Sequence, residues 1–441
     1  KQVAIETFPI TPSINLNAIQ TQKFKTNVLA VKLIVALDKE NASFYSLLCR
    51  VIKQGTENYP SITELSRKSQ ELYSLIHQVR TFKAGSDQII EFSVDYLKAS
   101  FIPDQCDICA NAVQILNELL FHPLLCDDEF SPAYVEREKQ GLCDAIRSRI
   151  NNKGAYALHR LIQQMCKEEA YGISAEGEID IIEQITPKTL YRAYRELLNT
   201  AKIELYFVGD ENIPRLIELL KPIFSKQNFI TELPKQAAIK RKEIEMSFEE
   251  IREAFPVKQS KLCMGFRLNR YISDADWTAS LVFCELFGAS PQSKLFMHVR
   301  EKLSLCYYCS AGVIASNGIM IVQSGIDRKN CELVKKAVCD MLREIQNGNF
   351  TAAELADAKR SLINNLLETQ DSAVAMENWY FIHGLYQLNI DIPEQVQMIQ
   401  DISREQVIRA AQEISADTLY FLEGTLDQSS LCDDEEEHAD E

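Results

Sequence analysis

The chain has 441 residues, and its 47 lysines and arginines against 63 aspartates and glutamates give a formal net charge of −16. Hydrophobic residues make up 46% and charged residues 25%, which is typical of a globular protein and excludes collagenous, disordered and membrane-spanning chains. The acidic balance argues against a nucleic-acid partner, because no basic stripe can neutralise phosphates. No membrane partner is expected either. The length is too great for one hydrophobic core and predicts two domains or three.

The first half of the chain alternates strand-like and helical segments. A capping-box pattern at Ser61 and Glu64 opens a helix whose apolar spacing extends to Ile76. Pro187 lies just inside another helix start, where its missing N–H costs nothing. Besides these two helices, we predict strands at 28–37, 88–94 and 203–208 and helices at 42–52, 104–120 and 132–150.

The second half repeats this order of elements. Ile402 and Ser403 open a helix as Ile185 and Thr186 do, and two similar strand-like runs end the halves, both at an offset of about 215 residues. Offsets this similar indicate an internal duplication. The predicted elements are a strand at 261–268, a strand or hairpin at 312–324, and helices at 277–287, 332–346 and 352–368.

Each half is predicted to be an α+β layer, a mixed sheet with helices packed on one face. We place the first domain at 1–223 and the second at 254–427. The segment 224–253 is charged and poorly periodic, and is the expected linker. The tail 428–441 is expected to be disordered, since seven of its last nine residues are acidic. Without those seven charges the body carries about −9.

Several kinds of chemistry lack their motifs in this sequence. Six histidines occur, no two within four residues, so no helix offers a two-histidine face for zinc. Two CxxC pairs, at 106–109 and 306–309, have neither the second knuckle of a zinc ribbon nor a thioredoxin-like context, which favours incidental thiols over zinc or redox sites. Nucleophile-elbow and phosphate-loop motifs are missing, and Gly288 is interpreted as a helix C-cap. With no secretion signal, the thirteen cysteines predict free thiols in the cytoplasm.

One segment is more specific. Residues 290–313 read SPQSKLFMHVREKLSLCYYCSAGV. A guanidinium such as that of Arg300 can hold a peptide carbonyl or carboxylate, and a neutral phenol such as that of Tyr307 can donate to an oxyanion. The simpler alternative is a solvated arginine and a half-buried strand tyrosine.

The segment resembles the C-terminal domain of the insulinase/pitrilysin family, which includes mitochondrial processing peptidase and carries the pattern SxLFxxxREKxGLxY. The family's arginine and tyrosine stand seven residues apart, as Arg300 and Tyr307 do. The resemblance covers nearly the whole chain. Within the family, residues 168–173 look closest to a bacterial branch associated with modification of elongation factor P. Residues 135–139 are similar to the helix that supplies the third zinc ligand, with Glu136 at that position.

The sequence departs from the family at the zinc motif. Active members carry HxxEH shortly before a turn that is KQGT here, at 53–56. Both histidines and the general-base glutamate are absent, and Arg50 would place a permanent positive charge where the cation should sit. Cys49 with Glu136 would leave zinc two protein ligands, one fewer than a catalytic site normally has. The five positions of the motif are Ser46, Leu47, Leu48, Cys49 and Arg50.

The resemblance therefore implies a chain that binds no metal and holds no cofactor of its own. In the family's two-chain arrangement, subunits close like clam shells around a chamber. We expect a related HxxEH-bearing partner to supply the zinc, with Arg300 anchoring the peptide backbone and Tyr307 stabilising the oxyanion. The alternatives are a non-catalytic structural or peptide-binding module, and an autonomous enzyme that uses Cys49 or the CxxC pairs. Acidic chamber walls would favour basic peptides.

Overall fold

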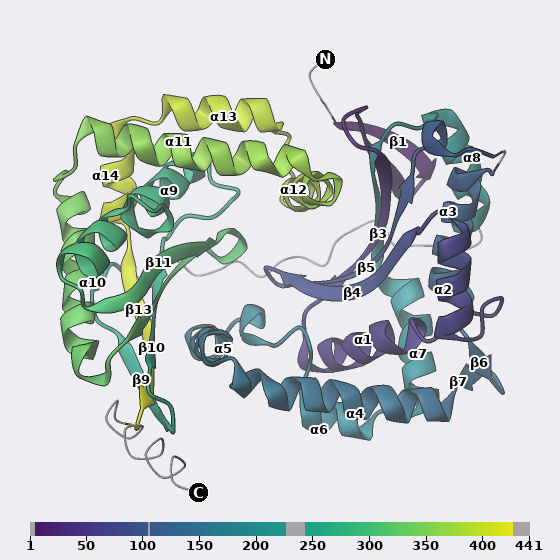
Figure 1. Ribbon diagram of the computed structural model, residues 1–441, viewed down its shortest axis with the longest axis horizontal. Helices are drawn as coiled ribbons and strands as arrows, with labels where there is room; N and C mark the ends of the chain where they lie inside the picture. The colour runs from purple at the N-terminus through teal and green to yellow at the C-terminus, as the bar shows by residue number, and fades with distance from the viewer. Residues whose placement is uncertain (1–4, 105, 226–242, 427–441) are drawn as a thin grey trace, which may run out of the picture. The chain divides into compact units, whose positions relative to one another are not determined.

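The computed structural model describes residues 5–104, 106–225 and 243–426. The chain forms two compact units, which are described separately (Figure 1). Neither unit is a continuous half of the sequence, because each contains a short segment from the other half. Unit 1 comprises Lys1–Ser148, Glu168–Ala238 and Leu367–Asp391, and unit 2 comprises Arg149–Lys167, Ile239–Leu366 and Ile392–Glu441.

The predicted linker lies only partly within the described residues, and the predicted tail lies wholly outside them. Residues 226–242 of the linker and the tail 428–441 lie outside the described residues. The last five residues of the segment predicted as linker, 249–253, belong to strand β9 (Glu249–Phe255). No helix in the described part of the chain is both long and apolar enough to cross a membrane.

Unit 1 is built on a six-stranded mixed sheet with the order β1-β2-β8-β3-β5-β4. Its one parallel pair is β2 with β8, and the other neighbours are antiparallel. The strands are β1 (Ile5–Thr11), β2 (Ile14–Gln20), β3 (Thr26–Ala36), β4 (Ile76–Ala84), β5 (Asp87–Leu97) and β8 (Lys202–Gly209). A separate short hairpin joins β6 (Leu125–Cys126) and β7 (Glu129–Phe130).

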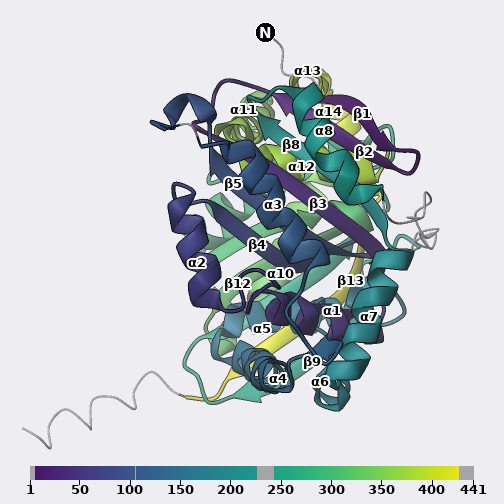
Figure 2. The same cartoon turned by 90° about the vertical axis from the view of Figure 1, so that its right-hand side faces the viewer.

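The central strand β3 is buried on both faces, which explains its nearly continuous apolar run. Leu29, Val31, Leu33 and Val35 point into a core shared with the helices, whereas Lys32 points to the opposite face. Figure 2 looks onto the helix-covered face. The helices of this unit are α1 (Lys39–Ile52), α2 (Ile62–Glu71), α3 (Ile108–Phe121), α4 (Pro132–Ser148), α6 (Ile179–Gln184), α7 (Pro187–Thr200) and α8 (Ile213–Phe224).

A further helix, α12 (Ala373–Leu385), contacts β3 and β8 from the opposite face of this sheet. It comes from the second half of the sequence. Phe381 of α12 packs edge-on against Phe82 and Tyr206 of the sheet. The prediction of helices on one face therefore holds for the main layer, and α12 is an addition to it.

Unit 2 repeats the strand order of unit 1. Its sheet runs β11-β12-β10-β13-β9, with β13 and β9 as the parallel pair. These strands correspond in order to β4, β5, β3, β8 and β2, which agrees with the predicted duplication. The remaining strands are β10 (Ser260–Arg267), β11 (Cys306–Ile314), β12 (Ile319–Ile326) and β13 (Ser415–Gly424).

The helices of unit 2 also repeat the pattern of unit 1. Helix α5 (Lys153–Met165), from the first half of the sequence, contacts β10 and β13. It is the counterpart of α12 in unit 1. The other helices are α9 (Trp277–Cys284), α10 (Cys331–Gln346), α11 (Ala352–Glu368), α13 (Ile392–Asp401) and α14 (Arg404–Gln412).

The predicted helix starts are confirmed. Ser61, Thr186 and Ser403 are N-caps whose side chains accept from the backbone N–H three residues on. The extension of the helix after Ser61 to Ile76 is wrong, because α2 ends at Glu71 and Ile76 begins β4. Tyr73 and Ser74, between them, have left-handed φ values of 56° and 60° and reverse the chain.

Candidate functional site

The positions of the zinc motif lie on α1, where the structure gives each residue another role. Ser46 Oγ lies 2.8 Å from the carbonyl oxygen of Glu176, and Leu47 and Leu48 are buried in the core. Cys49 is also buried, and burial raises the pKa of its thiol to about 12. A thiol that stays protonated is a poor metal ligand. These side chains support helix packing.

Arg50, at the last position of the motif, is held by an ion pair with α4. Its Nε donates to Oε2 of Glu138 at 3.1 Å. Arg137 Nε lies 3.3 Å from the other oxygen of the same carboxylate, and Arg137 also donates to Gln54. Gln54 in turn donates to the carbonyl oxygen of Arg50. Two guanidinium groups therefore converge on one carboxylate, Glu138, whose side chain is 12% exposed.

Glu136, the residue predicted at the third ligand position, lies elsewhere. Its side chain is 75% exposed and its carboxylate is 3.4 Å from Nζ of Lys139. It is an ordinary surface carboxylate, and the α4 residue that pairs with Arg50 is Glu138. Helical spacing could have found Glu138: Val135 and Leu142 are buried positions of α4, and Glu138 lies three residues after the first and four before the second.

The residues at these positions do not fit a zinc ion. Zinc needs three anionic or neutral donors around it, and here a guanidinium occupies the last position of the motif and is paired with the Glu138 carboxylate of α4. In the described ranges, no three histidine, cysteine, aspartate or glutamate side chains come together as a possible metal site.

Arg300 lies in unit 2, in the π-helical segment η5 (Leu295–Lys302) that precedes β11. Its guanidinium carbon is 4.7 Å from the centroid of the Phe296 ring, and its Nε is 3.7 Å from the Glu301 carboxylate. The side chain is 42% exposed. Stacking on Phe296 orients the flat guanidinium and leaves its edge accessible to a ligand.

Tyr307 lies at the start of β11 and is half exposed. Its hydroxyl donates to Oδ1 of Asp327 at 2.9 Å. The residue before it, Cys306, interacts electrostatically with Arg300. The structure therefore brings both predicted residues to one exposed corner of unit 2, between the end of η5 and the start of β11. We call Arg300, Cys306, Tyr307 and Asp327 the Arg/Tyr corner.

The backbone around this corner is irregular. A second π-helical segment, η4 (Glu285–Ala289), precedes it, and π-turns recur at functional sites. Gly288 lies in η4 and is not the predicted C-cap. An added Cβ would approach Ala311 Cβ at 2.6 Å, so the glycine is needed for close packing on β11. Ser304 has a left-handed φ of 51°, at the position where the family pattern has glycine.

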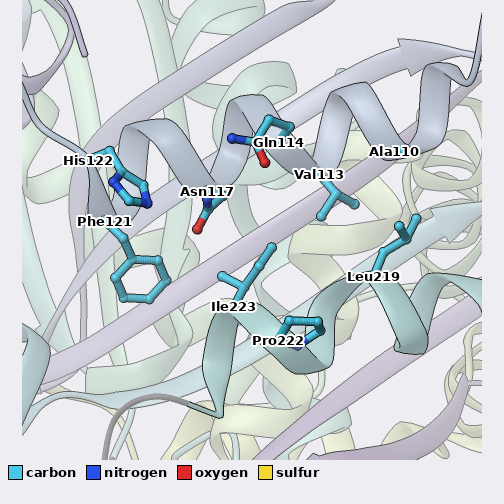
Figure 3. Close-up of a pocket in the computed structure, with 9 residues that line it drawn as sticks. All are labelled: Ala110, Val113, Gln114, Asn117, Phe121, His122, Leu219, Pro222 and Ile223. Carbon is cyan, nitrogen blue, oxygen red and sulfur yellow. The ribbon is translucent and has the colours of Figure 1, made fainter. Parts of the chain in front are cut away.

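A groove of about 570 Å³ lies between α3 and α8 of unit 1 (Figure 3). Its walls are mostly apolar, and His122, which lies 3.2 Å from the Glu57 carboxylate, is its one ionisable side chain. No predicted site residue lines it. We therefore assign the candidate site to the Arg/Tyr corner and not to this groove.

Comparisons with known proteins decide the family. A model of the "Peptidase M16 inactive domain" matches residues 184–362. A Bacillus subtilis (strain 168) protein named "Probable inactive metalloprotease YmfF" is 31% identical over 412 residues, which cover 93% of this chain and 96% of the relative. The chain belongs to the M16 peptidase family. The resemblance to insulinase-like peptidases is thereby confirmed.

Other comparisons agree with the M16 assignment. A crystal structure of a conserved protein from Enterococcus faecalis V583 is similar, with a TM-score of 0.86 and 27% identity over 95% of this chain and 98% of the other. A second B. subtilis protein, "Uncharacterized zinc protease YmfH", is 23% identical over 66% of this chain and 69% of its own. The matched model and YmfF are both described as inactive, and the Arg50–Glu138 pair accords with that: the chain is an inactive M16 member.

Proposed function

We propose that this chain is the zinc-free subunit of a two-chain M16 peptidase. A related partner carries HxxEH and supplies the zinc and its water, and this chain contributes the Arg/Tyr corner to the peptide site. The observation that carries the proposal is a contrast within one chain. The positions of the metal motif are occupied by core side chains and by Arg50, which is paired with Glu138 of α4, whereas Arg300 and Tyr307 remain exposed.

The corner suits a peptide in an extended conformation. A guanidinium presents paired N–H donors that match a carboxylate or a carbonyl, and Phe296 holds its plane. The Tyr307 proton is already directed at an anionic oxygen, that of Asp327. The oxyanion of a tetrahedral intermediate carries similar charge, so it can replace Asp327 as the acceptor.

The relatives support a pairing of unlike chains. One organism, B. subtilis (strain 168), has both a relative named as an inactive metalloprotease and one named as a zinc protease. Two such chains in one cell would supply the two halves that the proposal requires. A cytoplasmic location belongs to the same proposal, since the cysteines in the described ranges are free thiols, which suits a reducing compartment.

Assembly is tested by mixing purified chains. This chain and an HxxEH-bearing relative from the same organism are combined, separated by size and analysed for zinc. We expect a one-to-one complex with one zinc per pair, and cleavage of an unfolded polypeptide that neither chain produces alone. Two chains that elute separately at concentrations well above those in the cell would overturn the pairing.

A second function is favoured by one contact. The bond from Tyr307 to Asp327 already occupies the only phenolic proton, as expected of a residue that shapes a binding surface. Under this alternative the chain binds a peptide without contributing to its cleavage. A complex whose activity survives loss of the Tyr307 hydroxyl, but whose KM rises when Arg300→Ala is introduced, would support it.

A further inference from the structure

The CxxC pair at 306–309 has a geometry that its sequence spacing does not reveal. In a regular strand, residues three apart point to opposite faces of the sheet. Here β11 carries a bulge, and Cys306 pairs with Ile326 while Tyr308 pairs with Gly325 and Cys309 with Ser324. The cysteines thus occupy register positions only two apart, and Tyr307 is the extra residue.

Positions two apart in register lie on the same face of the sheet. Two strand steps of ~3.3 Å place such Cα atoms about 6.6 Å apart, within the ~4.4–6.8 Å range that a disulfide spans. Tyr308 points the other way, since its ring would meet a Cβ added at Gly325 at 2.5 Å. The bulge therefore converts an unfavourable spacing into a pair that can be bridged without moving the strand.

The two thiols are already in contact and differ in environment. They are hydrogen-bonded to each other, with Cys306 partly exposed and Cys309 3% exposed. The bond from Cys309 lowers the pKa of Cys306, with a further contribution from Arg300, and the same bond with burial raises the pKa of Cys309. An accessible thiol that ionises first, beside a buried one, is the arrangement of an attacking and a resolving cysteine.

The other CxxC pair shows that spacing alone does not produce this arrangement. Cys109 accepts a hydrogen bond from Tyr96, and Cys106 accepts one from Asn111. Asp107 between them caps α3, and burial raises the pKa of Cys109 to about 11. The pair therefore serves as an internal control within the same chain.

We propose that Cys306 and Cys309 form a reversible dithiol–disulfide pair that exchanges with low-molecular-weight disulfides. The Cys306 thiolate attacks one sulfur of the small disulfide, forming a mixed disulfide and releasing one small thiolate. Cys309 then loses its proton and attacks the sulfur of Cys306, which forms the Cys306–Cys309 bond and releases the second small thiolate. Two protein thiols are oxidised, one small disulfide is reduced to two thiols, and the two protons go to those thiols.

The bond would close a ring around Tyr307, the bulge residue of the Arg/Tyr corner. It would also convert the Cys306 thiol that interacts with Arg300 into a neutral disulfide sulfur. A consequence that rests on the proposed function is that oxidation changes peptide binding at this corner. The redox proposal itself does not depend on the partner chain.

The test uses the full chain, treated with oxidised glutathione, blocked with an alkylating agent and mapped by mass spectrometry. We expect residues 306 and 309 to become one internal disulfide, with the loss of two alkylatable thiols that a reductant restores. Cys309→Ser should stop at a glutathione adduct on Cys306, and Cys106→Ser should behave as the parent chain. Three results would overturn the proposal: no glutathione adduct on Cys306 in Cys309→Ser, a stable adduct on Cys306 in the parent chain, or bridging of residues 106 and 109 to the same extent as 306 and 309.

Discussion

Arg50 shows at a single position why this chain cannot use the family's metal. Its charge is permanent, since a guanidinium does not lose its proton in proteins. It lies over Gly141 of α4, where an added Cβ would come within 2.8 Å of its Nη2. The space that a cation would need is therefore taken by a side chain that is itself cationic, and Glu138 compensates its charge.

Replacing Glu138 tests this compensation. Glu138→Ala leaves Arg50 and Arg137 without their shared acceptor, and we expect the free energy of unfolding to fall by about 1–3 kcal/mol. Glu136→Ala, on the same helix but exposed, should change it by less than about 0.5 kcal/mol. Urea unfolding of both variants measures the difference. Equal effects would mean that Glu138 does not hold Arg50.

Zinc content gives a second test at this scale. The purified chain, saturated with zinc and then dialysed without chelator, should retain far less than one zinc per chain, because Cys49 stays protonated and Arg50 repels the cation. Metal analysis by mass spectrometry provides the measurement. Stoichiometric zinc that survives dialysis would contradict the assignment of an inactive metal site.

At the scale of elements, α12 is attached to the sheet of unit 1 through buried charges. Lys32, Glu91 and Arg80 are cross-strand neighbours on β3, β5 and β4. Lys32 is fully buried, pairs with Glu91, and reaches Glu377 of α12 at 3.1 Å. Its Nζ also lies 4.7 Å from the centroid of the Phe381 ring. Charge pairing and aromatic contact together fix where this helix docks.

This contact predicts a pH dependence. Burial raises the pKa of Glu377 from an ordinary 4.5 to about 7, against the attraction of Lys32. Because the folded state binds this proton more tightly, protonation of Glu377 stabilises the fold. The contribution is fully present below about pH 4.5 and is lost as the pH rises through about 7. At Glu91, burial raises the pKa, but the attraction of Lys32 and Arg80 outweighs it and the net pKa is lowered. A lowered pKa stabilises the fold above the carboxyl's ordinary pKa, and that contribution is lost only at more acidic pH.

We therefore expect Glu377→Gln to remove a stabilisation that the parent chain has at pH 5 and lacks at pH 8. The unfolding free energy of the parent minus that of the variant should be larger at pH 5 than at pH 8 by up to about 3 kcal/mol, at ~1.4 kcal/mol per pKa unit. Denaturant unfolding at both pH values measures it, with exposed Glu368→Gln as the matched control. A difference that does not vary with pH would contradict the shift.

The elements that could be predicted are those whose residue pattern depends on local structure alone, either burial within one sheet or the cap of one helix. The strand at 28–37 and the caps at Ser61, Thr186 and Ser403 are confirmed for that reason. Helix α12 could not be predicted, because it is apolar on several sides and lacks a clear periodicity. Its place on the sheet of unit 1 depends on Lys32, more than 340 residues away.

Only part of the candidate site could be predicted from the sequence. Arg300 and Tyr307 were found through the family pattern, and their shared exposed corner is a finding of the structure. The bulge at Tyr307 cannot be read from the sequence, since it depends on the register of β11 against β12. Glu138 was missed because the motif points to Glu136, whereas the face of α4 on which a side chain lies decides which carboxylate reaches Arg50.

At the scale of the whole molecule, the charge of the chain bears on its substrates. The body carries about −9 without its acidic tail. If the proposed chamber shares this sign, basic peptides should bind more tightly than acidic ones, and added salt should weaken their binding. Fluorescence anisotropy at about 0.05 and 0.5 M salt would measure it. Affinity that does not change with salt would contradict this expectation.

In the proposed function, a corner of this chain completes the active site of another chain. The most direct measurement is kcat for peptide cleavage by the assembled pair with Tyr307→Phe, beside Tyr308→Phe, whose ring lies against Gly325 of β12, as the control. We predict that Tyr307→Phe lowers kcat by about 10²–10³-fold, as for loss of one oxyanion donor, while Tyr308→Phe leaves it nearly unchanged. A pair that cleaves its peptide at the parent rate with Tyr307→Phe would contradict the shared-site mechanism.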